Sequence, residues 1–329
     1  MSSPRRNATA PLLPAGPDRV AVVAHAGKTF GGGRRQLRKI LTAAGHPKPL
    51  WYEVAKSSKA PKAIRHAIKK GADLIFVWGG DGMVQCSIDG MIEAGLEIPI
   101  AILPAGTANL LAHNLEIPLD LAAAAELGLH GVRQRLDVGV VNGERFAVMA
   151  GTGLDAITMR DVSKAAKKRV GRLAYFRSGM HAVRKPPVQM KIRVNGKQWF
   201  SGEASCVLVA NVGTITGGIK LFPKASPVDG ALELAVITAH STLDWARVFA
   251  RVATGHASRS PFVRTTRATR IIVELAAKEP FELDGGDRPR TKVLKFHVEG
   301  RAFTVCVPAA LSTPPRRSPR GRRKRSARA

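Results

Sequence analysis

The sequence predicts two domains of different fold class: an α/β N-terminal domain with a parallel sheet, followed by a mainly antiparallel β-sandwich. Three observations predict this. The chain has 329 residues, which is long for a single hydrophobic core. Strand and helix patterns alternate with short connections as far as about residue 132. Beyond that point, short β-rich segments joined by Asn-Gly turns replace them.

The N-terminal half repeats a strand followed by a helix. Its helical segments carry apolar residues on one face, as Leu37, Ile40 and Leu41 do. This alternation implies right-handed crossovers and a parallel sheet that is buried on both faces. The expected strands are residues 19–25, 49–54, 72–78 and 98–103, and the expected helices are residues 34–45, residues 60–71 and a segment that begins at Met83.

The C-terminal half has the pattern of an antiparallel domain. Asn-Gly pairs at 141–144 and 194–197 are strong hairpin signals. Only two helices interrupt the β-patterned segments, around 161–183 and 241–254. We expect the site to lie in the cleft between the domains. The predicted division is a disordered leader at 1–18, the α/β domain at 19–132, the β-rich domain at 133–308 and a disordered basic tail at 309–329.

The chain is strongly basic. It has 52 Lys and Arg against 24 Asp and Glu, and the body without the eight cations of the tail still carries +20. This charge predicts an anionic partner such as a phosphate compound, a nucleic acid or an acidic membrane surface. Aromatic residues are only 5% and no nucleic-acid module is recognisable, so we expect no specific nucleic-acid partner.

The cysteines and the apolar runs bear on the compartment. Cys86, Cys206 and Cys306 have neither metal-site spacing nor the density of a disulfide scaffold, which favours the reducing cytoplasm. No apolar run approaches the roughly 20 residues that span a bilayer, and the Pro-rich N-terminus lacks a signal-peptide core. We therefore expect a cytoplasmic protein that meets membranes from the water side.

A glycine turn interrupts the predicted strand in "FVWGGDGMVQ" at 76–85. A Gly-rich turn at the end of a parallel strand lets backbone N–H groups approach phosphates, and the following helix adds its positive end. The glycines are Gly79, Gly80 and Gly82, and Asp81 between them would hold Mg²⁺ or accept a proton. A tight β–α turn with an Asp cap is the alternative reading.

A second strand ends in the same way, in "IAILPAGTANLLAHNLEIP". After Gly106, we expect Thr107 to cap the following helix and Asn109 to point into the same crevice. The two turns follow successive strands of one sheet and should therefore lie close together. Two such glycine turns on one edge of the sheet favour nucleotide binding over a purely structural role as tight turns.

The first strand also ends in a glycine loop, "AHAGKTFGGG" at 24–33. It is not a Walker A motif, because the upstream glycine that should precede Gly27 and Lys28 is missing. Lys28 and Thr29 are candidates for phosphate contacts. A flexible solvent loop is the alternative.

Two carboxylates stand out in the C-terminal half. Asp155 in "AGTGLDAI" either orients a substrate hydroxyl or amine or caps a helix. Asp284 in "FELDGGDRP" suits a general base on a tight turn that faces a cleft, although a hairpin turn is the simpler reading of that segment alone. Between them, "KAAKKRVGRLAYFR" is by default a solvated basic face from which one or two cations reach a phosphate.

Taken together, "GGDGM", "PAGTANLLAHNLEIP", "GTGLDA", "PVDGALELAVIT" and "ELDGG" in this order resemble the diacylglycerol kinase catalytic family, which includes bacterial lipid kinases and sphingosine kinases. The likeness spans about residues 19 to 308. "GGDG" alone is shared with NAD kinases and phosphofructokinases, whereas "PAGTANLLA" is far more specific.

The resemblance implies an ATP-binding α/β domain of the NAD kinase and diacylglycerol kinase type, a β-sandwich, and Mg²⁺-dependent phosphoryl transfer to a lipid hydroxyl. Diacylglycerol, converted to phosphatidic acid, is the expected acceptor, in phospholipid biosynthesis. The alternatives are a kinase that acts on another lipid such as a sphingoid base, an NAD kinase, and a non-catalytic scaffold. The implied partners are the lipid, an anionic membrane surface and a second copy of the chain in a homodimer.

The resemblance also assigns residues. It implies that Asp284 and Asp81 take part in catalysis, and it leaves open which of them removes the proton. It implies that Asp155 contacts the lipid headgroup. The nucleotide contacts are carried over to Gly27, Lys28, Thr29, Gly79, Gly80, Gly82, Met83, Gly106, Thr107, Asn109, Lys168 and Arg172.

The sequence departs from the family pattern at several of these positions. Met83 stands where the family usually has Thr, and Gly286 stands where it usually has Glu. Asp287, the next residue, would take the place of that Glu. Asp229 is a candidate metal ligand, but Val228 stands where many bacterial members have a second Asp. Other departures are His25 and Ala26 for Asn-Pro, and Gln85, Cys86 and Asp89 in the helix after "GGDG".

Overall fold

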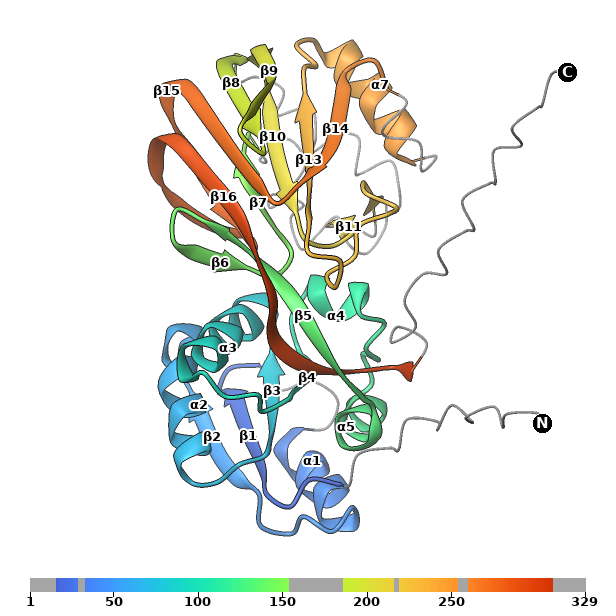
Figure 1. The fold of residues 1–329 in the computed structure, drawn as a ribbon. Coiled ribbons are helices and arrows are strands. Elements are labelled where there is room, and N and C mark those ends of the chain that lie inside the picture. Colours follow the sequence, from blue (N-terminus) through green and yellow to red (C-terminus); the bar gives the residue numbers. More distant parts are fainter. Residues whose placement is uncertain (1–15, 29–32, 154–185, 216–218, 254–259, 310–329) are drawn as a thin grey trace, which may run out of the picture.

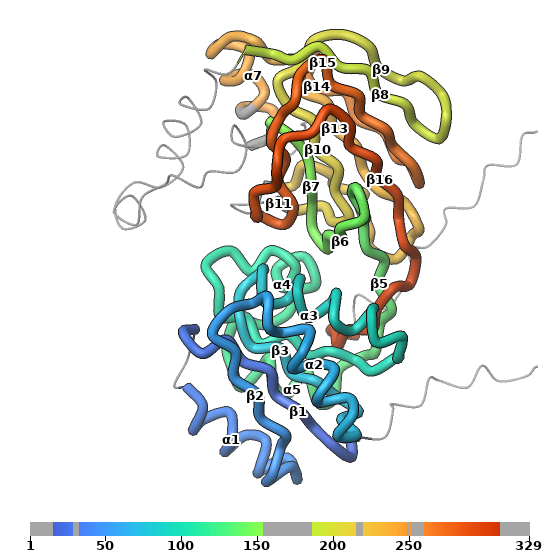
Figure 2. Tube along the Cα trace, turned by 90° about the vertical axis from the view of Figure 1, so that its left-hand side faces the viewer, coloured from blue at the N-terminus to red at the C-terminus, as the bar shows by residue number. Residues whose placement is uncertain are grey.

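The computed structural model describes residues 16–28, 33–153, 186–215, 219–253 and 260–309. In these residues the chain forms two lobes, one above the other, and strands β5 (Val132–Val141) and β16 (Gly286–Val307) run through both (Figures 1 and 2). The lower lobe is α/β with parallel strands, and the upper lobe is antiparallel and β-rich. The predicted fold class is confirmed.

The lower lobe is a parallel sheet in the order β2–β1–β3–β4. Helices α1 and α5 contact each other, as do α2 and α3, so the two pairs cover the two faces (Figure 1). The strands are β1 (Val20–His25), β2 (Leu50–Val54), β3 (Leu74–Gly79) and β4 (Ile100–Pro104). The helices are α1 (Gly33–Ala43), the 3-10 turn η1 (Ser57–Lys59), α2 (Ala60–Lys69), α3 (Asp81–Ala94), α4 (Leu110–Asn114) and α5 (Leu121–His130).

Helix α3 begins two residues earlier than the sequence predicts. Its first residue is Asp81, and Gly80 is the N-cap in an extended conformation. Every residue of β3 before it is buried, as a central parallel strand requires. Asp81 therefore stands in the first helical turn, at the point where the buried strand meets the space between the lobes.

The upper lobe contains the antiparallel order β14–β13–β10–β7–β15–β16, with the β8–β9 hairpin beside β15 and the β5–β6 pair beside β16. Helix α7 (Thr242–Ala253) confirms the second predicted helix, and the one expected at 161–183 lies outside the described residues. The strands are β6 (Glu144–Phe146), β7 (Met149–Thr152), β8 (Val188–Val194), β9 (Lys197–Ala204), β10 (Cys206–Ala210), β11 (Thr214–Ile215), β12 (Ile219–Lys220), β13 (Leu232–Ile237), β14 (Val263–Ala268) and β15 (Arg270–Leu283).

Alternation along β10 separates two hydrophobic clusters. Val207 and Val209 belong to the cluster inside the upper lobe, whereas Cys206, Leu208 and Ala210 belong to the cluster that continues into the lower lobe. Successive strand residues point to opposite faces, so both faces of this strand are buried. The hydrophobic core thus extends from the upper lobe into the lower lobe.

Strand β16 extends from the upper lobe into the lower lobe. A register shift between Glu299 and Phe303 interrupts its pairing with β5 around Gly300 and Arg301. Beyond it, Val305 pairs with Ile100 of β4, so the end of the strand lies in the lower lobe. The division at residue 132 stays a prediction, and β5 and β16 cross it.

No helix in the described ranges combines the length and apolar character that a membrane span requires. Most of the predicted leader and tail, residues 1–15 and 310–329, lies outside those ranges.

Candidate active site

The two glycine turns touch each other at the top of the lower lobe. The N–H of Ala105 donates to the carbonyl of Gly79 at 2.8 Å. A Cβ placed on Gly106 would lie 2.6 Å from the Cα of Gly80, a separation that such atoms essentially never show. The expected proximity of the turns is confirmed, and glycine is required at the contact.

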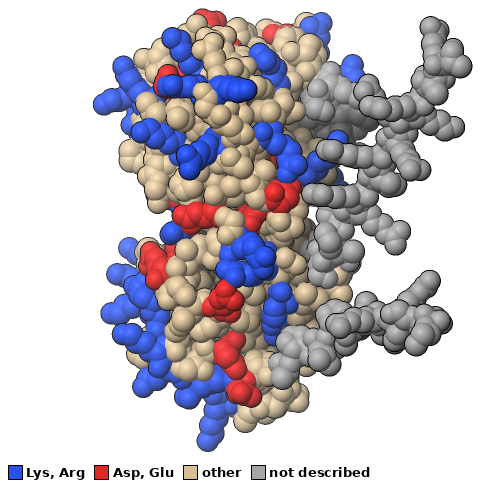
Figure 3. All heavy atoms as spheres, in the orientation of Figure 1, with Lys and Arg blue, Asp and Glu red and all other residues tan. Residues whose placement is uncertain are grey.

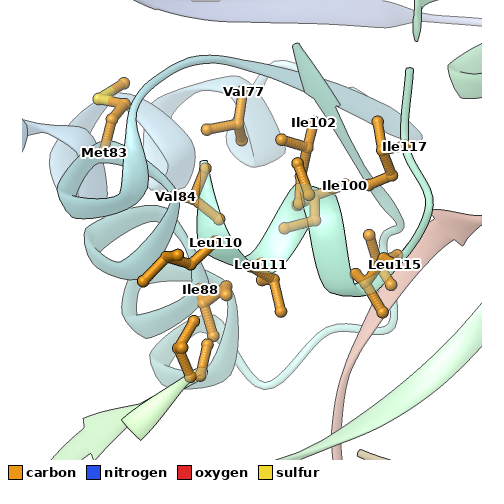
Figure 4. Close-up of a cluster of buried hydrophobic side chains, with 14 of the residues drawn as sticks. Val77, Met83, Val84, Ile88, Ile100, Ile102, Leu110, Leu111, Leu115 and Ile117 are labelled. Atoms are coloured by element: carbon orange, nitrogen blue, oxygen red, sulfur yellow. The ribbon is translucent and has the colours of Figure 1, made fainter. Parts of the chain in front are cut away.

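Met83 supports this loop from behind. Its side chain is 1% exposed, and a Cβ on Gly79 would lie 2.5 Å from the Met83 Cβ. The N–H of Met83 is also engaged, donating to the carbonyl of Gly80 at 2.9 Å. The predicted contact of Met83 with a nucleotide therefore does not fit the structure, because the side chain lies in the core drawn in Figure 4.

The first loop reaches the same place. The Lys28 Nζ lies 3.3 Å from the position that a Cβ on Gly80 would take, and the Lys28 N–H closes a turn onto the His25 carbonyl at 3.0 Å. The first N–H groups of α3 have no partner within their helix and carry its positive end. An ammonium group and a helix N-terminus thus lie together, which is an arrangement suited to phosphate groups.

Asp81 ties α3 to the second loop. Its Oδ1 accepts a hydrogen bond from the N–H of Leu110, the first residue of α4, at 2.5 Å. Thr107, which was expected to cap this helix, is exposed instead. The cap comes from 29 residues earlier in the chain, and Asp81 keeps one carboxylate oxygen that bonds no other described residue.

Asn109 does not point into the crevice. Its Oδ1 accepts from the Gly106 N–H at 2.8 Å, its Nδ2 donates to the Gly106 carbonyl at 3.0 Å, and the residue is 9% exposed. The backbone of Asn109 is left-handed, with φ of 46°, a conformation that Asn tolerates better than most residues. Asn109 therefore shapes the loop as a clamp on Gly106.

Asp284 lies on the turn of the β15–β16 hairpin. Leu283 pairs with Gly286, and Asp284 and Gly285 both have positive φ, as a two-residue hairpin turn requires. The hairpin reading is confirmed, yet the carboxylate is not a solvated turn residue. It accepts three hydrogen bonds of 2.7 to 3.0 Å from the main-chain N–H groups of Ala147, Val148 and Met149.

The charge of Asp81 acts on the other candidate catalytic carboxylate, Asp284. The pKa of Asp284 is raised to about 6, mainly by burial and to a smaller extent by the charge of Asp81, while the three N–H donors oppose the shift. Asp81 thus acts on Asp284 across the boundary between the lobes. A carboxylate whose pKa lies near neutrality suits proton transfer at ordinary pH.

Gln85 and Asp89, two of the departures from the family pattern, connect α3 to the upper lobe. The Gln85 Nε2 donates to the Asp89 Oδ2 at 2.7 Å and to the carbonyl of Arg145 in β6 at 3.2 Å. Burial raises the pKa of Asp89 to about 6, against the opposing charge of Arg145.

Asp229 is engaged by an arginine. The Arg267 guanidinium pairs with the Asp229 carboxylate and, at 3.0 Å, with Glu233. No cluster of three or more potential metal-binding side chains occurs in the described ranges. The prediction of Asp229 as a metal ligand is therefore not supported. Asp287, a candidate substitute for the family Glu, is exposed on β16, where it pairs with Glu282 of β15.

Four predicted site residues lie outside the described residues: Thr29, Asp155, Lys168 and Arg172. A cavity of about 120 Å³ in the upper lobe is lined by residues of β7, β8 and β15 together with Gly153 and Pro186. Its wall is largely apolar and includes Met190, Leu275 and Phe281, with Phe281 three residues before Asp284.

Sequence reasoning missed Asn211, which is bonded to the main-chain segment whose N–H groups hold Asp284. Asn211 is 2% exposed and its Nδ2 donates to the carbonyls of Asp137 and Ala147. A signal existed, because an Asn at the end of the apolar run "VLVAN" must find partners once it is buried. The main-chain donors of Ala147, Val148 and Met149 have no signal of this kind.

Comparisons with known proteins agree over most of the chain. The family model described as diacylglycerol kinase catalytic domain matches residues 20–141, and that of the YegS C-terminal NAD kinase beta sandwich-like domain matches residues 148–312. A solved diacylglycerol kinase structure from Bacillus anthracis str. Sterne has a TM-score of 0.69 at 22% identity, covering 90% of this chain and 98% of that one. That likeness supports the fold.

Two relatives support the activity class. "Diacylglycerol kinase" of Bacillus subtilis (strain 168) is 31% identical over 226 residues, which are 67% of this chain and 74% of the relative. "Probable lipid kinase YegS-like" of Pseudomonas aeruginosa (strain UCBPP-PA14) is 30% identical over 266 residues, 78% of this chain and 85% of the relative. With both family models matched in order, the chain belongs to the diacylglycerol kinase catalytic family and is a lipid kinase.

Proposed function

We propose that this lipid kinase transfers the γ-phosphoryl group of ATP to the hydroxyl of diacylglycerol, giving phosphatidic acid. The observation that carries the proposal is the contact between Gly80 and Gly106 at the start of α3, where Asp81 lies and from where its charge acts on the carboxylate of Asp284. Phosphoryl transfer depends on positioned phosphates, neutralised charge and a group that receives the hydroxyl proton. The residues around this contact offer all three.

The nucleotide phosphates would lie at the start of α3. The main chain of Gly79 to Gly82, the Gly106–Thr107 turn and the Lys28 ammonium group surround that position. Mg²⁺ fits the remaining oxygen of Asp81, since this ion is usually held by one or two carboxylates together with substrate phosphates. When bound, it neutralises charge that develops on the phosphates.

Asp284 is proposed as the general base. Its three hydrogen bonds fix the carboxylate and leave room for one more, because a carboxylate has about four acceptor sites. A pKa of about 6 leaves it mostly ionised at pH 7 and close to the optimum for accepting a proton. The acceptor hydroxyl would then approach from the upper lobe.

We assign lipid binding to residues 133–308 and nucleotide binding to residues 19–132. The apolar cavity beside Phe281 supports this division, because it would receive part of an acyl chain close to Asp284. Asp155 as a headgroup contact, and Lys168 and Arg172 as phosphate contacts, remain proposals from the resemblance.

A basic edge of the lower lobe supports peripheral binding to anionic bilayers on the cytoplasmic side, as expected of phospholipid biosynthesis. Residues 33–72, which include α1, β2 and α2, contain eleven Lys and Arg and a single acidic residue, Glu53. Arg34 neutralises Glu53 at 2.8 Å. Figure 3 shows the blue side chains gathered over the region of α2 and β2. Each cation near an anionic surface contributes about 1 kcal/mol.

The experiment that tests the function is incubation with γ-labelled ATP, Mg²⁺ and a panel of acceptors: diacylglycerol, monoacylglycerol, sphingosine and NAD. Labelled phosphatidic acid, absent with the Asp81→Asn variant, is the expected product. Label in another lipid or in NAD would replace diacylglycerol as the acceptor. ATP binding without any product would favour a scaffold, and sedimentation of the same sample tests the proposed homodimer.

Vesicle sedimentation tests the membrane surface. Charge reversal of Arg35, Lys39, Lys62 and Lys69 on the basic edge should weaken binding to phosphatidylglycerol vesicles, more so at low salt. A second variant, truncated after Pro308, removes the charge of the tail and tests its contribution separately. Unchanged binding in both variants would show that neither surface draws the protein to the bilayer.

A further inference from the structure

An asparagine side chain joins the lobes beside the candidate active site. The Nδ2 of Asn114, the last residue of α4, donates to the carbonyl of Thr214 at 2.8 Å, and its Oδ1 accepts from the Thr214 N–H at 2.8 Å. Thr214 opens β11 of the upper lobe. Two antiparallel bonds of this kind resemble a pair in a β-ladder and fix both distance and orientation.

The other end of α4 is fixed to Asp81. Leu110 gives its N–H to the Asp81 carboxylate at 2.5 Å, and its carbonyl accepts from the Asn114 Nδ2 at 2.9 Å. This helix has only five residues. Asn114 and Asp81 are therefore both hydrogen-bonded to Leu110 of one short helix.

The upper lobe completes the connection to Asp284. Three residues before Thr214, Asn211 donates its Nδ2 to the Ala147 carbonyl at 3.1 Å and its N–H to the Val148 carbonyl at 2.9 Å. The N–H groups of Ala147 and Val148 hold the Asp284 carboxylate at 2.7 and 3.0 Å. One continuous set of hydrogen bonds and short main-chain segments thus links the two carboxylates.

We propose that Asn114 and Asn211 are positioning residues that set the separation of Asp81 and Asp284 for phosphoryl transfer. The proposal rests on the roles given to these two carboxylates above. Strands β5 and β16 join the lobes (Figure 1), Gln85 bonds the Arg145 carbonyl, and the asparagines add a constraint that is connected to both candidate carboxylates. Neither asparagine is assigned a contact with nucleotide or lipid.

The Asn114→Ala variant tests the proposal, with Asn142→Ala as a matched control. Asn142 makes the same two-point pairing with main chain, its Nδ2 to the Val293 carbonyl at 3.0 Å and its Oδ1 from the Lys295 N–H at 2.9 Å. This pairing lies entirely within the upper lobe. The control removes the same two-point pairing without loosening the lobes. Because Asn142 has a φ of 50°, its replacement also strains the backbone, so kcat is compared per folded molecule.

The expected result for Asn114→Ala is a kcat lowered about tenfold to hundredfold, because misplacement by about 1 Å can cost that much. The KM for ATP should stay within about twofold, since the lower lobe is intact. The acid limb of the kcat profile should shift to lower pH, because Asp81 and burial raise the pKa of Asp284 less when the lobes part. Asn142→Ala should leave kcat and the profile unchanged.

Hydrogen exchange gives a readout that does not need activity. The amides of residues 147–149 and Thr214 should exchange faster in Asn114→Ala than in the wild type or in Asn142→Ala. The proposal is overturned if exchange, kcat and pH profile are unchanged, or if both variants lose kcat equally. A wild-type protein that phosphorylates no lipid would refute the proposed function, while exchange would still decide whether Asn114 couples the lobes.

Discussion

Gly106 offers a direct perturbation of the contact between the two glycine turns. In Gly106→Ala, the added methyl group would lie 2.6 Å from the Gly80 Cα and 2.7 Å from the Asn109 Oδ1. Carbon atoms prefer about 3.5 Å or more, so the loops must separate by about 1 Å. Overpacking of this kind costs about 1–3 kcal/mol of stability.

The expected kinetic loss in Gly106→Ala is larger than the stability loss implies. A displacement of about 1 Å at the phosphates predicts a fall in kcat/KM for ATP of about a hundredfold. Gly90→Ala is the matched control, because its methyl group would lie 2.7 Å from the Pro61 Cα, and Gly90 is nine residues along α3, about 13 Å from Asp81.

Steady-state kinetics and thermal unfolding of both variants provide the assay. The stability of both should fall, whereas only Gly106→Ala should lose kcat/KM per folded molecule. Equal kinetic losses in the two variants, or an unchanged kcat/KM in Gly106→Ala, would refute the claim that the contact forms a phosphate site.

Two further predictions concern charge. Because the pKa of Asp284 is raised from 3.8 to about 6, its ionisation should cost the fold stability as pH rises from 4 to 7, by about 2–3 kcal/mol. Chemical denaturation should therefore show that the free energy of unfolding of Asp284→Asn, relative to that of the wild type, increases by this amount between pH 4 and pH 7. A difference that does not change with pH would contradict the raised pKa of Asp284. Because Arg267 already pairs with Asp229 and Glu233, EDTA should leave the unfolding temperature unchanged, whereas Arg267→Ala should lower it; a fall with EDTA alone would indicate a structural metal ion.

The sequence was informative where the determining interactions are local. Unbroken apolar runs such as "LIFVW" identify strands buried on both faces, and the glycine turns after Trp78 and Leu103 identify where those strands end. Parallel order then brings the turns together, because successive strands end at the same edge of a sheet. The local Asp-Gly signal after a predicted strand likewise identified the hairpin turn that carries Asp284.

Sequence reasoning failed where distant residues decide local structure. The cap of α4 comes from Asp81 and not from the adjacent Thr107. The ion pair of Arg267 with Asp229 and the link from Asn114 to Thr214 join segments whose spacing in the sequence predicts no contact.

The central claim is that Asp81 of the lower lobe and Asp284 of the upper lobe act together in phosphoryl transfer to a lipid. Single-turnover kinetics of Asp81→Asn and Asp284→Asn, with enzyme in excess over γ-labelled ATP and diacylglycerol in mixed micelles, test it most directly. We predict that both variants fold and bind ATP within a few-fold of the wild type, yet transfer the phosphoryl group at least about a hundredfold more slowly. A folded variant of either residue that transfers at the wild-type rate would contradict the account.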